Sequence, residues 1–116
     1  MNVYGKESSS LLRLNDSVAQ NLRLQRRGTE GVIVKRFDHV VDELARPDDS
    51  IFVKLDVQGF ELPVLRGAEH GLARVQGMEI ELSLAPLYHR QALVGEVIDY
   101  LEKRGFRMIW LERILV

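Results

Sequence analysis

Residues 51–57, with the sequence IFVKLDV, constrain the fold of this chain more than any other stretch. Five of the seven positions are apolar and fall on both alternating faces, and only Lys54 and Asp56 are charged. A strand of this kind is typical of the centre of a parallel sheet whose two sides are both covered by helices. We therefore expect a buried central strand here.

The residues after this strand predict a tight turn and a helix. Gln58 and Gly59 have turn character, and Glu61 would lie near the positive end of a helix dipole. Pro63 is tolerated in the first helical turn, where backbone N–H groups have no partner within the helix. The helix should run towards Leu72.

The rest of the chain continues the alternation of strands and helices. Residues 32–34 are β-branched, residues 78–84 alternate with period two, and residues 106–116 are strongly apolar, so each predicts a strand. Asp38 is expected to cap a short helix. A third helix, which ends at Gly105, carries apolar side chains at helical spacing: Val94, Val97, Ile98 and Leu101.

This order predicts an α/β fold with a mainly parallel sheet and helices on its faces, because a parallel pair needs a crossover connection. With 116 residues the chain suits one domain, residues 1–116. Residues 1–30 form a poorly defined segment in which we expect a loop and a short helix. Residues 31–116 form the alternating core.

Charge and composition narrow the function classes. A formal net charge of −1 gives no broad electrostatic footprint for nucleic acid or for an anionic membrane. The chain has no cysteine, which fits a cytoplasmic location. It shows neither a signal peptide nor an apolar stretch long enough to span a membrane. His39, His70 and His89 are too dispersed for a recognised zinc motif, so no metal site is predicted.

The polar residues of the predicted strands suggest where chemistry could occur. Lys54 and Asp56 share one face of their strand, and Glu81 lies towards the end of the following strand. Ligands of open parallel sheets bind beyond the carboxyl ends of the strands, so Asp56 and Glu81 are candidate pocket residues and general bases. Alternatively, Lys54 neutralises Glu79 or Glu81, and Asp56 accepts backbone N–H groups of the next helix.

The loop after the third strand contains Tyr88 and His89, which we take as candidate substrate-binding residues. A polar loop at the carboxyl end of a strand is a place where an acceptor substrate can be recognised. An ordinary exposed loop remains the alternative.

Three blocks in this order resemble the second half of FkbM-type methyltransferases. They are residues 54–61 (KLDVQGFE), residues 64–68 (VLRGA) and residues 80–88 (IELSLAPLY). Asn2, residues 8–12 (SSSLL) and the pair Phe37-Asp38 also resemble the stretches that precede this core, so the similarity covers almost the whole chain.

The resemblance implies a partial Rossmann-like methyltransferase fold with S-adenosylmethionine as the methyl donor. It also implies an acceptor hydroxyl on a sugar, a polyketide or another small metabolite. By position, Asp56, Gly59 and Glu61 would belong to the cofactor edge of the site, with Asp56 and Glu81 as the catalytic candidates. In such a reaction, catalysis rests mainly on positioning, with a base to remove the hydroxyl proton.

In that family a Gly-rich strand-to-helix turn and an acidic residue that holds the ribose precede these blocks. Neither is found in these residues, so we expect the chain to represent the C-terminal portion of such an enzyme. A sheet without its first strands has open edges and uncovered apolar faces. The alternative function is therefore a non-enzymatic interaction module that forms a homodimer or pairs with a complementary chain.

Overall fold

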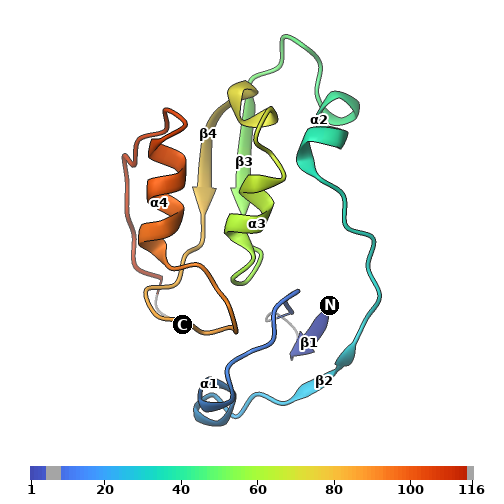
Figure 1. Cartoon of the computed structure of the whole chain (residues 1–116), viewed down its shortest axis with the longest axis vertical. Coiled ribbons are helices and arrows are strands. Elements are labelled where there is room, and N and C mark those ends of the chain that lie inside the picture. Colours follow the sequence, from blue (N-terminus) through green and yellow to red (C-terminus); the bar gives the residue numbers. More distant parts are fainter. Residues whose placement is uncertain (5–8, 115–116) are drawn as a thin grey trace.

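The computed structural model describes residues 1–4 and 9–114. Figure 1 shows a βαβ unit with helices on either side of it, and a smaller group of elements at the opposite end of the molecule. In chain order the elements are β1 (Asn2–Tyr4), α1 (Asp16–Asn21), β2 (Arg26–Thr29), α2 (Phe37–Leu44), β3 (Ile51–Leu55), α3 (Glu61–Arg66), the 3-10 helix η1 (Gly71–Arg74), β4 (Val75–Ile80) and α4 (Val94–Glu102).

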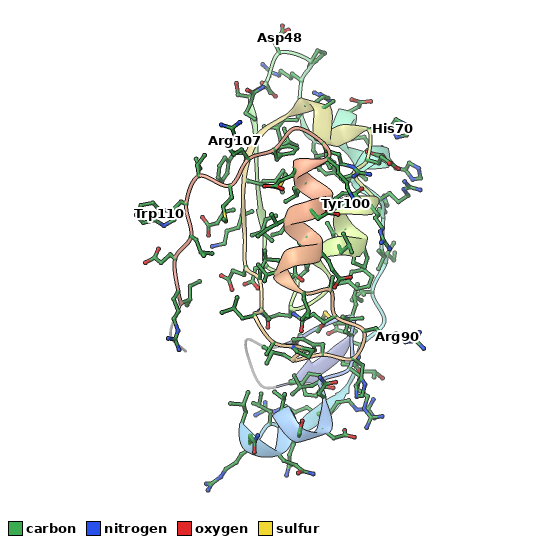
Figure 2. All side chains as sticks on the ribbon, turned by 60° about the vertical axis from the view of Figure 1, so that its left-hand side comes forward. Asp48, His70, Arg90, Tyr100, Arg107 and Trp110 are labelled. Carbon is green, nitrogen blue, oxygen red and sulfur yellow. The ribbon has the colours of Figure 1, made fainter. Side chains whose placement is uncertain are left out.

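β3 and β4 pair in parallel, with Lys54 opposite Glu79 and Leu55 opposite Ile80. α3 and η1 form the crossover between the two strands, and α4 lies beside α3 on the same side of the sheet (Figures 1 and 2). The expected mixed α/β architecture with a parallel strand pair is therefore present. The described residues provide two strands of parallel sheet, which is less than a full Rossmann-like sheet.

The main core lies between the inner face of the two strands and the helices α3 and α4. Leu65 is 2% exposed and Val97 is fully buried, so each helix inserts at least one side chain completely. The other buried members of this cluster are Leu55, Leu62, Ala68, Leu72 and Val75. Burial of these apolar side chains supplies the main favourable term for folding.

The other face of the sheet is uncovered among the described residues. Phe52 is 67% exposed, and Lys54 and Glu79 lie on the same face with more than half of each side chain exposed. In Figure 2 the helices lie on one side of the strands, and the C-terminal segment with Trp110 lies on the other. The expectation that helices cover both sides of residues 51–57 is therefore wrong.

Two of the predicted strands do not form. Residues 32–34 and 106–114 belong to no strand, and their side chains point largely into solvent, with Ile33 91% and Ile109 92% exposed. A strand requires a neighbouring strand to take its backbone hydrogen bonds, and these apolar stretches find none. Residues 115–116 of the predicted last strand lie outside the described residues. The strand expected over 78–84 instead spans 75–80.

The last helix agrees with the expectation from its apolar spacing and its terminal glycine. Gly105 has φ +87°, and its N–H donates to Glu102 O at 3.0 Å. Phe106 N–H donates to Leu101 O at 3.1 Å, which completes a Schellman motif. Gly105 therefore ends the helix by adopting a backbone conformation that L side chains rarely tolerate.

The N-terminal segment contains the expected short helix, α1, together with a strand pair that the sequence did not indicate. β1 and β2 are antiparallel, with Asn2 opposite Thr29. All residues of β2 are exposed, so it lacks the alternating pattern that would have predicted it. Tyr4, Leu14 and Tyr88 form a second buried cluster, which joins this segment to the loop after β4.

Asp38 was expected to cap its own helix, but it does not. Its carboxylate accepts hydrogen bonds from the backbone N–H groups of Gly71 at 2.7 Å and His70 at 3.3 Å. α2 is thereby fastened to the start of η1, a distant segment whose free N–H groups need an acceptor.

We expect Asp38→Ala to lower the free energy of unfolding by about 1 kcal/mol at pH 7. Burial raises the pKa of Asp38, but hydrogen bonds from Gly71 and His70 outweigh it and hold the pKa below its usual value. A lowered carboxylate pKa stabilises the fold above the unfolded pKa of about 4, and this contribution disappears as the pH falls through the folded pKa. Urea unfolding at pH 7 and in acid measures both effects.

The exposed Glu43 of the same helix provides the matched control. Glu43→Ala should change the free energy of unfolding by less than about 0.5 kcal/mol. A difference between Asp38→Ala and the unmodified chain that stayed constant down to the most acid conditions would contradict the assigned role of Asp38.

Candidate functional site

Residues 56–61, here called the carboxylate turn, connect the end of β3 to the start of α3. Phe60 N–H donates to Val57 O at 3.3 Å, and the two central residues, Gln58 and Gly59, have φ angles of +49° and +94°. Two successive positive φ angles are characteristic of a type I′ turn, where glycine carries no steric penalty. The turn therefore has a defined conformation that depends on Gly59.

Two carboxylates belong to this turn and have different environments. Asp56 is exposed, and its Oδ1 accepts a hydrogen bond of 2.7 Å from Gln58 Nε2. Glu61 is only 2% exposed, and its Oε1 accepts the backbone N–H of Gly59 at 3.0 Å. Within the described part of the chain, the buried Glu61 Oε2 has no hydrogen-bond partner. A buried acceptor without a donor is costly and suggests that a ligand could supply one.

Two segments that are distant in the sequence hold the carboxylate turn in place. Ser10 is buried, and its Oγ donates to Gln58 O at 2.7 Å. Tyr88 donates its hydroxyl to Gln58 Oε1 at 3.0 Å. Gln91 Oε1 accepts the N–H groups of Leu87 and Tyr88, which fixes the loop that carries this tyrosine. The N-terminal segment and the loop after β4 therefore position one glutamine.

Tyr88 was expected in a polar loop that recognises the acceptor, with an ordinary exposed loop as the alternative. Its side chain is only 3% exposed, so the alternative does not hold for this residue. Burial raises the pKa of Tyr88, and the neighbouring Tyr4, Glu61 and Asp56 raise it further. The hydroxyl therefore stays protonated and continues to donate to Gln58 at neutral pH. His89, the next residue, is exposed. Contact of either residue with a substrate stays a prediction.

Lys54, Asp56 and Glu81 lie at the same edge of the sheet. Glu81 N–H donates to Leu55 O at 3.0 Å, which continues the β3–β4 register and brings Glu81 beside Asp56. Strand alternation places all three on the uncovered face. The structure thus brings these side chains together, and the catalytic roles of Asp56 and Glu81 stay predictions.

Lys54 forms an ion pair of 2.9 Å with Glu79 Oε1, as the alternative interpretation of the sequence allowed. The hydrogen bond and charge of Glu79 raise the pKa of Lys54, with smaller contributions from Glu81 and Asp56. Both partners are largely exposed, so the pair does not offset a buried charge. The alternative also had Asp56 accept backbone N–H groups of the next helix, and this is wrong. Asp56 accepts the side-chain amide of Gln58, and Glu61 accepts the backbone N–H of Gly59.

Sequence reasoning missed Ser10 and Gln91 as part of this arrangement. Ser10 contacts a residue 48 positions away in the sequence, and no local pattern distinguishes it from the neighbouring serines. Gln91 bonds to Leu87 and Tyr88 across a turn in which Arg90 has a positive φ of +59°. Neither contact produces a sequence periodicity that could have predicted it.

Tyr88→Phe should lower the free energy of unfolding by about 0.5–1.5 kcal/mol, because it removes one partly buried hydrogen bond. Thermal or urea unfolding measures this loss. The matched control is Tyr100→Phe, which removes a hydroxyl hydrogen bond of 3.3 Å to Leu65 O away from the carboxylate turn. If only Tyr88→Phe changes the chemical shifts of the Gln58 side-chain amide, the assigned contact holds; unchanged shifts would contradict it.

No helix in the described part of the chain is long and apolar enough to cross a membrane. A family model described as the methyltransferase FkbM domain matches residues 2–108, which include the carboxylate turn and both segments that contact it. Searches of curated proteins and of solved structures find no match.

Proposed function

The chain belongs to the FkbM methyltransferase domain family, and from this premise we propose that it acts in S-adenosylmethionine-dependent O-methylation. The acceptor that we propose is a hydroxyl group on a sugar, a polyketide or another small metabolite. The match of the family model over residues 2–108 is the single observation that carries this proposal.

The chemistry of the carboxylate turn fits the proposed donor. S-adenosylmethionine supplies an electrophilic methyl group on a cationic sulfonium and carries hydroxyl and amino donors. The turn offers the exposed carboxylate of Asp56 and the unpartnered Oε2 of Glu61 as acceptors. Gly59 lies between these two carboxylates in the turn, and its backbone N–H donates to Glu61 Oε1.

Asp56 and Glu81 are the proposed general bases for the acceptor hydroxyl. They lie at adjacent strand ends on the uncovered face, where a small molecule can approach from solvent. Gln58 Nε2 holds one oxygen of Asp56, which leaves the other oxygen to accept a proton. The exposed His89 is the residue of the following loop that we propose contacts the acceptor.

Calorimetric titration of the chain with S-adenosylhomocysteine tests the proposal. We expect saturable binding that Asp56→Ala weakens at least tenfold, a difference of about 1.4 kcal/mol, without loss of the folded state. Asp48→Ala is the matched control, because this exposed aspartate lies at the far end of the molecule from the carboxylate turn (Figure 2). Equal affinities for the two variants, or no binding at all, would contradict the proposed donor site.

One observation favours a second function, that of an interaction module. The uncovered face of the sheet and the C-terminal segment expose large apolar side chains, including Phe52 at 67% and Trp110 at 79%. Exposed apolar surface of this kind often marks an interface. Under this alternative the chain forms a homodimer or pairs with a complementary chain.

Sedimentation velocity of the chain and of Phe52→Lys distinguishes this alternative. A dimer that dissociates in the variant and binds no S-adenosylhomocysteine would favour the interaction module. A monomer that binds the cofactor analogue would favour the methyltransferase.

A further inference from the structure

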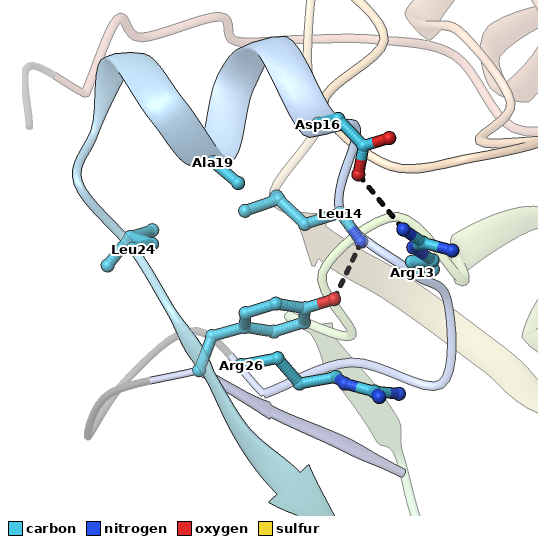
Figure 3. A pocket seen from close by; sticks show the side chains of 7 residues that line it. Arg13, Leu14, Asp16, Ala19, Leu24 and Arg26 are labelled. Carbon is cyan, nitrogen blue, oxygen red and sulfur yellow. Dashed lines mark hydrogen bonds and ion pairs between the residues drawn. The ribbon is translucent and has the colours of Figure 1, made fainter.

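A small cavity lies between α1 and the β1–β2 pair, outside the carboxylate turn. Its volume is about 240 Å³, somewhat below the range of about 300–1,000 Å³ typical of pockets for drug-sized ligands. Figure 3 shows the side chains that surround it. A space of this size suits a single ring or a short alkyl chain.

The walls of the cavity are mostly apolar. Leu14, Ala19 and Leu24 contribute aliphatic surface, and Tyr4 contributes its ring. The Tyr4 hydroxyl accepts the N–H of Leu14 at 3.1 Å, so its polar end already has a partner within the protein. A ligand in the cavity would therefore contact the ring and the aliphatic groups through its own apolar part.

Cationic side chains line the same cavity. Arg13 and Arg26 both contribute to the lining, and in Figure 3 the two side chains are directed towards one end of it. Asp16 Oδ1 pairs with Arg13 at 3.0 Å in a solvent-exposed contact. Arg26 donates one long hydrogen bond of 3.5 Å to Asn2 Oδ1. Among the described residues that line the cavity, two guanidinium groups therefore stand against one carboxylate, which leaves an excess of positive charge in this lining.

We propose that this cavity binds a small amphiphilic anion, either a carboxylate or a phosphate monoester with a compact apolar body. The apolar body would occupy the space between Tyr4 and Leu24. The anionic group would accept hydrogen bonds from Arg26, since guanidinium groups match the geometry of carboxylate and phosphate oxygens. The proposal concerns binding alone and is independent of methyl transfer.

Calorimetric titration of the full chain with phenyl phosphate, phenylacetate and neutral benzyl alcohol tests this site. We expect one of the two anions to bind at least tenfold more tightly than the alcohol, and the stronger anion identifies the ligand class. Arg26→Gln should weaken that binding about tenfold. Arg27→Gln, the adjacent exposed arginine of the same strand, which does not line the cavity, should leave it unchanged.

A second variant tests the cavity itself. Ala19→Phe fills the space with a ring and should abolish binding of the anion, while circular dichroism verifies that the chain remains folded. The proposal is overturned if no anion binds the folded chain at millimolar concentration. It is also overturned if Arg26→Gln and Arg27→Gln have equal effects, or if benzyl alcohol binds as tightly as the anions.

Discussion

Leu65→Ala lowers the free energy of unfolding by about 2–5 kcal/mol, the largest expected effect of a single truncation in the main core. Leu65 is 2% exposed, lies near the C-terminal end of α3 and belongs to the main core between the sheet and the helices. The substitution removes apolar burial and leaves a cavity that the surrounding helices can fill only in part. Because a domain of this size has a total stability of about 5–15 kcal/mol, urea unfolding should show a greatly lowered midpoint.

Leu44→Ala is the control for this prediction. Leu44 is also helical, but it is 74% exposed, so the same change of side chain removes little buried surface. It should alter the free energy of unfolding by less than about 0.5 kcal/mol. Similar losses in the two variants would contradict the assignment of Leu65 to the core.

Gly59→Ala should destabilise the chain by about 2–4 kcal/mol, because two separate costs add. The backbone at this position has φ +94°, which is unfavourable for any side chain. A Cβ atom would also approach Tyr88 Cδ2 to 3.0 Å and Gln91 Cδ to 3.2 Å. Both neighbours belong to the loop that fixes Gln58, so the carboxylate turn should be displaced as well.

Gly105→Ala separates these two costs. Gly105 has a similar φ of +87°, but a Cβ atom there would have no described atom within 4 Å. Gly105→Ala should therefore lower the free energy of unfolding by about 1–2 kcal/mol through backbone strain alone. Urea unfolding of both variants gives the contact contribution as their difference. If the two variants lost the same free energy of unfolding, Tyr88 and Gln91 would be able to move aside freely, which would contradict close packing around the turn.

Local sequence signals predicted the elements that local interactions determine. The strand after residue 50, the turn at Gly59 and the start of the helix after it all formed, because proline, glycine and acidic residues act within one turn of the chain. The helix was expected to run towards Leu72, but it ends at Arg66, and Gly71–Arg74 forms a separate 3-10 helix. α4 and its terminal glycine followed the same rule.

Predictions that depended on distant partners were less successful. Residues 32–34 and 106–114 have strand-like composition but no neighbour to pair with, since strand formation is decided by tertiary contacts. Lys54 was expected to be buried because both faces of its strand are apolar in pattern, yet the structure leaves one face open. An apolar pattern shows which face of a strand can be buried. Whether that face is buried depends on the other helices and strands that pack against it.

The candidate site shows the same division. Asp56 and Glu81 could be placed at one edge from strand order alone, and the β3–β4 register brings them together. The contacts of Ser10 and Tyr88 with Gln58 span 48 and 30 residues, so no local pattern could reveal them. Asp38 was assigned to its own helix because the sequence cannot show that η1 lies within reach.

We propose that the carboxylate turn, held by Ser10 and Tyr88, is the part of the chain that meets the methyl donor. A titration with S-adenosylhomocysteine, followed residue by residue through the backbone amide signals in ¹H–¹⁵N correlation spectra, tests it most directly. We predict that the largest shifts occur at Gln58, Gly59 and Glu61. Largest shifts elsewhere in the folded chain, or unchanged spectra at saturating ligand, would contradict this donor site.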